Sequence, residues 1–217
     1  PERETTGLCP LIENHIEKRH VFMTEPNNCI LRPESEKDRD RSEFVTREAF
    51  WNVYRPGCSE HYILHRFRDL SDFVPDLNYV LETDGEVIGH IMYSHAEIQT
   101  DDGQKIPIMV FGPVSILPEY QGRGYGSMLI THTLKKAADL GCGAVAITGN
   151  PDYYKRFGFE SGQAYGVYYA AVPRSEETPF FMIKELKKGY LDGIVGSYTD
   201  PPGYFADDAA VEAFDRR

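Results

Sequence analysis

A glycine-rich hexapeptide at residues 121–126 constrains the fold more than any other feature of the sequence. It reads Gln-Gly-Arg-Gly-Tyr-Gly, follows the strand-like run 114–117, and opens the helical apolar pattern of residues 124–140. Alternate glycines let successive backbone N–H groups crowd together without interference from Cβ atoms. At a helix N-terminus these groups lack intrahelical acceptors and lie at the positive end of the helix dipole. The sequence therefore predicts a strand–loop–helix unit that binds phosphate or pyrophosphate, with Arg123 as an added cation.

Two familiar phosphate-binding motifs fit this loop poorly. A P-loop would close on Gly-Lys-Ser/Thr, whereas Gly126 and Ser127 are adjacent here and no lysine separates them. A dinucleotide-binding GxGxxG loop follows the first strand of a parallel βαβ unit, whereas this loop has GxGxG spacing and follows an expected antiparallel meander. A glycine-rich turn with no ligand remains the alternative on the hexapeptide alone.

The rest of the chain predicts an α/β sandwich with a mixed sheet. Turn signals at Asp84-Gly85 and at 101–103 make residues 77–117 an antiparallel meander. We expect one domain at 29–188, an N-terminal extension at 1–28 and an acidic C-terminal extension at 189–217. Strands are expected at 29–33, 77–83, 86–99, 105–117, 144–148, 164–172 and 178–186, and helices at 37–53, 59–70, 124–140 and 150–157.

Charge and cysteine content weigh against several classes of protein. The chain of 217 residues has 34 acidic and 23 basic side chains, a net charge of -11, which disfavours nucleic-acid binding and slightly favours a cationic ligand. No apolar run approaches the roughly 20 residues needed to cross a bilayer, and we expect no membrane partner. The scattered cysteines (Cys9, Cys29, Cys58 and Cys142) predict reduced thiols in a cytoplasmic protein, without disulfides or a zinc site.

Two motifs together resemble the GNAT N-acetyltransferase superfamily. Gln121-x-x-Gly124-x-Gly126 is similar to its Q/R-x-x-G-x-G/A signature, and GNPDYYKRFGFE at 149–160 resembles its N-x-x-x-Y-x-x-x-G-F ending, most of all in the YhbS-like branch of predicted acetyltransferases. The resemblance covers about residues 29–186. It implies a mixed, mostly antiparallel central sheet, flanked by helices and splayed at the strand pair that holds acetyl-CoA.

The resemblance also implies a binding site for acetyl-CoA, the acyl donor. The pantetheine arm would lie in the V-shaped gap of the sheet, against the backbone of Ser115, Ile116 and Leu117. Asn150 would reach this arm, cap the helix that follows it, or do both. The pyrophosphate would rest on the N–H groups of Gln121, Gly122, Arg123, Gly124, Tyr125, Gly126 and Ser127.

The same resemblance implies a general acid and leaves the general base open. Tyr154 would protonate the departing CoA thiolate, the alternative being a hydrogen-bonded core tyrosine, and its neighbour Tyr153 would pack or line the cleft. Val110 stands where many relatives carry a glutamate base. If the turn at 101–103 sets the strand pairing, His95 lies opposite Met109 and could relay a proton through water.

The predicted function is an N-acetyltransferase that moves the acetyl group of acetyl-CoA to a primary amine by direct attack in a ternary complex. The amine could belong to a small molecule or to a protein, and a homodimer stays open. A non-catalytic acyl-CoA-binding sensor or regulatory domain is the alternative. His61 and His65 have metal-binding spacing but lack a third ligand, so we expect no metal. Cys142 lacks a polarising partner and is not expected to be a nucleophile.

Overall fold

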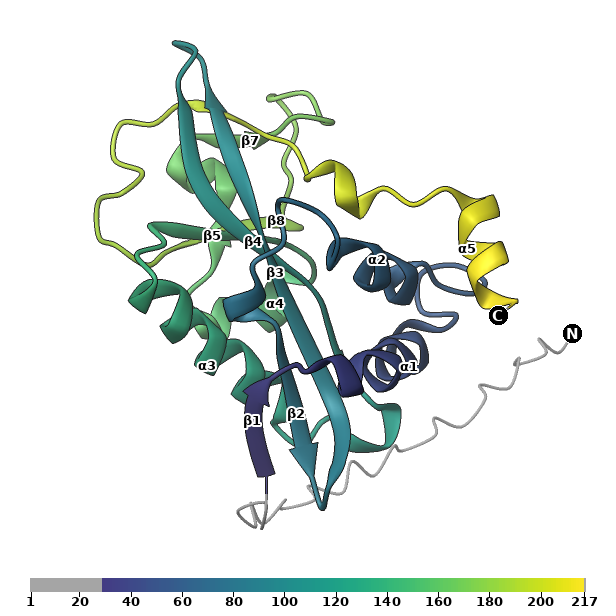
Figure 1. Cartoon of the computed structure of the whole chain (residues 1–217). Coiled ribbons are helices and arrows are strands. Elements are labelled where there is room, and N and C mark those ends of the chain that lie inside the picture. Colours follow the sequence, from purple (N-terminus) through teal and green to yellow (C-terminus); the bar gives the residue numbers. More distant parts are fainter. Residues whose placement is uncertain (1–28, 217) are drawn as a thin grey trace, which may run out of the picture.

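The computed structural model describes residues 29–216 as one mixed sheet with helices on both faces (Figure 1). The strands are β1 (Cys29–Pro33), β2 (Tyr79–Thr83), β3 (Glu86–Thr100), β4 (Lys105–Ile116), β5 (Ala144–Thr148), β6 (Glu160–Ser161), β7 (Val167–Tyr169), β8 (Phe181–Glu185) and β9 (Gly196–Tyr198). The α-helices are α1 (Arg39–Phe50), α2 (Glu60–Phe67), α3 (Tyr125–Asp139), α4 (Pro151–Tyr154) and α5 (Asp208–Asp215).

The order of the strands is β1-β2-β3-β4-β5-β8-β6. Neighbours in this order are antiparallel except for β4 and β5, which are parallel. The predicted meander is β2-β3-β4, and α3 provides the crossover from β4 to β5. β9 pairs with β3 in antiparallel fashion and with β7 in parallel fashion. The expected fold class, mixed and mostly antiparallel, is confirmed.

The two faces of the sheet are covered by different helices. On one face the Tyr93 hydroxyl of β3 lies 3.0 Å from the Thr133 hydroxyl of α3. On the other face the Ser115 hydroxyl of β4 lies 3.0 Å from the Thr46 hydroxyl of α1. Figure 1 shows α3 on one side of the long strands and α1 with α2 on the other. Within residues 29–216, no helix is long and apolar enough to span a membrane.

The sheet splays between β4 and β5. The two strands pair only at Met109↔Val145 and Val110↔Ala146. Beyond these pairs β5 continues along β8 as far as Thr148, whereas the β4 segment 111–116 pairs with β3 alone. The register of the β3–β4 ribbon shifts at this point, because Met92 alone on β3 lies opposite both Gly112 and Pro113 on β4, which bulge. The edge of β4 that faces β5 is therefore open where the resemblance placed the gap.

Several predicted elements are shorter than expected. The helix expected at 37–53 ends at Phe50, because Asn52 adopts a φ of 58° and its side chain accepts a hydrogen bond from the Gly57 amide. The second helix covers 60–67 instead of 59–70. The strand predicted at 164–172 shrinks to β7, because a short 3₁₀ turn occupies 162–165 and Gly166 follows it with a φ of 72°. The alternating aromatic pattern there was wrong as a long-strand signal.

The acidic C-terminal segment is more ordered than its proline-rich sequence suggests. It contributes β9 to the sheet and ends in α5, which packs beside α2 (Figure 1). The Phe214 ring lies 4.7 Å from the His65 ring and 5.3 Å from the Tyr62 ring. Residues 1–28, expected to form an N-terminal extension, lie outside the described residues.

Candidate active site

A cavity of about 390 Å³ joins the two sequence motifs. It lies between the open edge of β4, the glycine-rich loop, the first turn of α3, and α4. Its lining residues are Val114, Ile116, Tyr120, Gln121, Gly122, Gly124, Tyr125, Gly126, Ser127, Tyr153, Tyr154 and Arg156. The fold thus brings 114–127 and 153–156, separate in the sequence, to one site.

The loop presents a row of unbonded backbone amides. The Gln121 N–H already donates to the Pro118 carbonyl at 3.2 Å, and the Met128 N–H donates to the Gly124 carbonyl at 3.1 Å. Between them, the six amides of residues 122–127 have no hydrogen-bond partner within residues 29–216. Gly122 and Gly124 adopt φ values of 73° and 89°, a left-handed conformation that L side chains disfavour. Amides gathered this way form a concave donor site for an anion.

Gly126 is required by a close contact across the cavity. A Cβ atom at this position would lie only 2.9 Å from the Tyr153 hydroxyl and 3.8 Å from Ile116 Cγ1. A side chain at position 126 would therefore force the Tyr153 hydroxyl away from the first turn of α3. Tyr153 lines the cavity, as predicted, and its hydroxyl lies over the glycine-rich turn.

Tyr154 combines a buried ring with a hydroxyl that has no protein partner. Its ring packs at 5.9 Å from both Phe111 and Phe159. Its hydroxyl makes no hydrogen bond within the described part of the chain, although the residue lines the cavity. Burial raises the pKa of Tyr154 well above its usual range, with smaller contributions from Tyr153 and Tyr54. The phenol therefore stays protonated at neutral pH and can donate a hydrogen bond or a proton into the cavity.

Comparison with known proteins agrees with this arrangement. The model of the acetyltransferase (GNAT) family matches residues 47–159, which contain the glycine-rich loop and the Tyr154 segment. The chain belongs to this family. The resemblance inferred from the two motifs is thereby confirmed.

Two curated relatives come from Escherichia coli strain K12, and both are described as uncharacterized N-acetyltransferases. YjhQ is 33% identical over 104 residues, which cover 48% of this chain and 56% of YjhQ. YhbS is 29% identical over 115 residues, which cover 53% of this chain and 65% of YhbS. The match therefore spans between about half and two thirds of the length of these relatives.

Solved GNAT structures share the fold. YhbS from Escherichia coli in complex with CoA superposes with a TM-score of 0.71 at 22% identity, covering 83% of this chain and 94% of that one. A GNAT family acetyltransferase from Brucella melitensis in complex with acetyl-CoA superposes with a TM-score of 0.64 at 26% identity, covering 82% of this chain and 99% of that one. The agreement extends well beyond the segment that the family model matches.

The three residues expected along the GNAT gap are used differently. Ile116 lines the cavity. The Ser115 side chain points to the opposite face, toward Thr46, and the Leu117 N–H donates to the Ile88 carbonyl at 2.9 Å. Of these three residues, only Ile116 lines the cavity.

Gln121 and Asn150 have local structural roles. The Gln121 side chain donates to the Ile116 carbonyl at 2.9 Å and its backbone N–H is already bonded to Pro118, although the residue still lines the cavity. The unbonded amides are therefore those of residues 122–127, and the predicted contact of Gln121 with the donor stays a prediction. Asn150 caps α4, because its side-chain oxygen accepts from the Asp152 N–H at 2.9 Å. Its amide nitrogen remains available, so the predicted contact with the pantetheine arm stays a prediction.

The cation that lines the cavity is Arg156, not Arg123. Arg156 lies over the Tyr153 ring at 4.7 Å from its centroid and lines the cavity. Arg123 lies over Tyr120 at 5.6 Å and is absent from the lining. The two sequence motifs predict no role for Arg156. Its position three residues after Tyr153, one helical turn away, was the available signal.

Among residues 29–216, no general base lines the cavity. None of its lining residues is Asp, Glu or His. Val110 is buried in a second apolar cluster and pairs with Ala146. His95 lies opposite Met109, as predicted, but it lines a different cavity at the outer edge of β3. The structure therefore does not bring His95 to Tyr154.

His61, His65 and the nearby thiol of Cys58 are held by structural contacts. The His61 ring lies between Cys58 Sγ, 3.3 Å from its Nδ1, and Asp215 Oδ1, 2.8 Å from its Nε2, while His65 contacts Glu43. Burial, then Glu60, raises the pKa of the Cys58 thiol to about 12. No group of three or more metal-binding side chains occurs in the described segment 29–216.

Proposed function

We propose that the chain transfers the acetyl group of acetyl-CoA to a primary amine. The observation that carries this proposal is a single cavity lined by five residues with unbonded amides (Gly122, Gly124, Tyr125, Gly126 and Ser127) and by Tyr154, whose hydroxyl has no partner within residues 29–216. A diphosphate needs convergent N–H donors, and a departing thiolate needs a proton donor. The solved relatives in complex with CoA and acetyl-CoA support the same assignment.

In this proposal the donor is bound mainly by the backbone. The diphosphate accepts hydrogen bonds from the amides of residues 122–127, and Arg156 adds a positive charge at the cavity wall. The pantetheine arm extends past Ile116 along the edge of β4 that β5 leaves open, where its amides can pair as an added strand would. Asn150 can donate its side-chain amide to this arm while its oxygen caps α4.

The chemical step is direct attack of a neutral amine on the thioester carbonyl. The nitrogen lone pair forms the C–N bond, the tetrahedral intermediate collapses, and the C–S bond breaks. The Tyr154 O–H donates its proton to the departing sulfur and recovers one from solvent. The proton on the new amide nitrogen leaves to water, since no carboxylate or imidazole lines the cavity among the described residues. The rate should therefore rise with pH as the free amine fraction of the acceptor rises.

The acceptor class is a primary amine of a small molecule or of a protein. A net charge of -11 suits an acceptor that approaches as a cation.

A thiol-release assay with acetyl-CoA and a panel of amines tests the proposal. Wild type should turn over at least one amine class. Tyr154→Phe should lower kcat by about 10²–10⁴-fold, the usual range for a lost general acid, and leave the Kd for acetyl-CoA unchanged. Tyr168→Phe is the matched control, since this hydroxyl makes no hydrogen bond within residues 29–216 and lies outside the cavity. Equal kcat for wild type and Tyr154→Phe would remove Tyr154 from the mechanism.

A non-catalytic acyl-CoA sensor is the second candidate, and the cavity without Asp, Glu or His favours it. Saturable acetyl-CoA binding with no turnover on any amine would select the sensor. Absence of binding to any acyl form of CoA would overturn both functions.

A further inference from the structure

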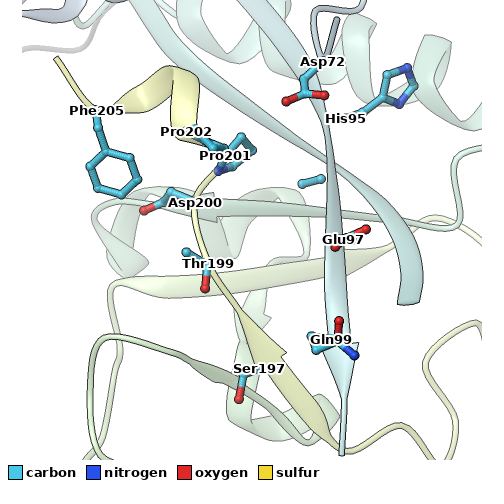
Figure 2. Close-up of a pocket in the computed structure, with 11 residues that line it drawn as sticks. Asp72, His95, Glu97, Gln99, Ser197, Thr199, Asp200, Pro201, Pro202 and Phe205 are labelled. Atoms are coloured by element: carbon cyan, nitrogen blue, oxygen red, sulfur yellow. The ribbon is translucent and has the colours of Figure 1, made fainter. Parts of the chain in front are cut away.

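The sheet opens a second time between β3 and β9, on the side of β3 that faces away from β4. These strands pair from Ile98↔Tyr198 to Thr100↔Gly196 and then diverge. Further along β3, the His95 N–H donates to the Asp72 carbonyl at 2.7 Å. A cavity of about 560 Å³ fills the interval between these two contacts. Figure 2 shows Glu97 and Gln99 on β3 facing the segment that leads from Ser197 to Pro202 across this opening. We call it the β3–β9 cleft.

The β3–β9 cleft has unpaired strand edges. Pro107, which lies opposite Glu97 on β4, has no N–H to donate. The alternation of an antiparallel ladder then directs the Glu97 N–H and C=O away from β4 and toward the cleft. Neither these groups nor the Thr199 N–H makes a hydrogen bond across the cleft within residues 29–216. An extended chain inserted here would find backbone partners on both sides.

The charge of the β3–β9 cleft is negative. Asp72, Glu97 and Asp200 line it, and no lysine or arginine of the described segment 29–216 does. Asp200 is fixed by two phenols, since Tyr169 donates to one carboxylate oxygen at 2.5 Å and Tyr198 to the other at 3.0 Å. Burial, together with Asp200 itself, raises the pKa of both phenols, so they stay protonated and donate to this side chain.

Nearby cations leave this charge available. Lys105 pairs with Glu97 at 2.6 Å, but both side chains are about half exposed, and such pairs contribute little and exchange easily. Arg174 is held by both oxygens of Asp101, at 2.6 and 2.8 Å, and touches only the Ser197 hydroxyl at the far end of the cleft.

Apolar groups complete the walls of the cleft. Pro201, Pro202 and Phe205 line it, and 63% of Phe205 is exposed, which is high for a large apolar side chain. A lysine side chain suits these surroundings, because its four-carbon stem packs on apolar surface while its ammonium group reaches a carboxylate.

We propose that the β3–β9 cleft binds an extended, lysine-bearing peptide segment, which pairs with the open edges at Glu97 and Thr199 and places its ammonium groups on Asp72, Glu97 and Asp200. The site needs no acyl-CoA and is separate from the cavity at Tyr154. Its occupant is recognised by positive charge and by an extended backbone together.

Fluorescence anisotropy with a labelled octapeptide of alternating lysine and threonine tests the charge part, using the full chain without acyl-CoA. We expect saturable binding that weakens about three- to tenfold in Asp72→Asn and in Glu97→Gln, as for partly exposed ion pairs. Asp139→Asn removes one exposed carboxylate from α3 and should change nothing. No saturable binding, or equal affinity in wild type and both cleft variants, would overturn the proposal.

A second pair of ligands tests the strand part. The same peptide with alternate backbone amides N-methylated keeps its charge but loses hydrogen-bond donors, and it should bind at least about tenfold more weakly. Spermidine carries the charge with no peptide group and should also bind more weakly than the octapeptide. If the methylated peptide or spermidine binds as tightly as the octapeptide, the cleft recognises charge alone and the proposed peptide mode is wrong.

Discussion

The cavity at Tyr154 and the β3–β9 cleft use one architectural device with opposite chemistry. Each occupies a point where two neighbouring strands pair briefly and then part, β4 from β5 in the first case and β3 from β9 in the second. Within the part of the chain that the structure describes, the first is lined by unbonded amides and Arg156, without a carboxylate. The second is lined there by three carboxylates, without a lysine or arginine. A splayed sheet supplies backbone hydrogen-bond partners in both places, and the side chains around it determine whether the site suits an anionic or a cationic ligand.

The first prediction separates the two regions by blocking one of them. Gly126→Val places side-chain atoms where a Cβ alone already lies 2.9 Å from the Tyr153 hydroxyl. The Kd for acetyl-CoA should rise about a hundredfold, or about 3 kcal/mol, because hydrogen bonds to a charged acceptor contribute about 1.5–3 kcal/mol each. Isothermal titration calorimetry measures this change.

Two controls show whether the effect is local. Thr131→Val makes a β-branched change on the exposed side of the same helix and should leave the Kd for acetyl-CoA unchanged. Gly126→Val should also bind the lysine peptide as wild type does. Unchanged acetyl-CoA affinity in Gly126→Val would show that the donor does not lie in this cavity.

The two regions also differ in how far the sequence could predict them. The amide site rests on contiguous segments, 114–127 and 150–159, whose glycine spacing and strand–loop–helix order are local signals. The β3–β9 cleft brings together Asp72, Glu97 and Asp200 from distant segments, and β9 has only three residues. The Asp200-Pro201-Pro202-Gly203 stretch forms only a short 3₁₀ turn at Pro202–Tyr204, and its sequence does not show what the segment packs against.

Particular residues show the same limit within the amide site. Arg123 was chosen because it lies inside the glycine-rich loop, yet the direction of a side chain in such a loop depends on φ values near 73° and 89° at its glycine neighbours. Arg156 reaches the cavity through the helical turn of α4, a tertiary relation between two motifs. Local patterns therefore predicted the strand–loop–helix unit around the cavity, but not which arginine lines it.

A second prediction contrasts two histidines of β3. His90, opposite Ser115, is fully buried, whereas His95 is exposed in the β3–β9 cleft. Burial lowers the pKa of His90 to about 4, against about 6.5 in an unfolded chain, with Glu34 opposing and Arg68 adding to the shift. Between these values the unfolded chain binds a proton that the folded chain excludes. The free energy of unfolding should therefore fall as the pH drops from 6.5 toward 4.

Urea denaturation at several pH values between 7 and 4.5 measures this loss, which should reach the order of 2 kcal/mol in wild type. His90→Gln should be less stable than wild type at pH 7, but its free energy of unfolding should change less with pH over the same range. Protonation of Glu34 also destabilises the fold, but only at lower pH, because the pKa of this carboxyl is lowered. Burial alone would raise that pKa, but the hydrogen bond from Arg68 and the charge of His90 outweigh the effect of burial. An equal slope in wild type and variant would place the acid sensitivity elsewhere.

A third prediction tests which arginine gives the amide site its positive charge. Arg156→Gln should raise the Kd for acetyl-CoA about tenfold, as for one charge-assisted contact, and the difference from wild type should shrink in high salt. Arg123→Gln should change the Kd less than about threefold. The Arg123 side chain stacks on Tyr120, a lining residue, but does not itself line the cavity. A larger effect at Arg123 would restore the assignment made from the sequence.

The smallest expected effect concerns Asn150, where one side chain can serve the fold and the ligand together. Asn150→Ala removes the cap on α4 and should lower the free energy of unfolding by about 1 kcal/mol. Asn150→Asp keeps an oxygen to accept from the Asp152 N–H but loses the amide donor. It should retain wild-type stability while the Kd for acetyl-CoA rises a few-fold, measured by thermal melting and calorimetry. If Asn150→Asp binds acetyl-CoA as tightly as wild type, capping is the whole role of Asn150, and the pantetheine arm depends on the open edge of β4 alone.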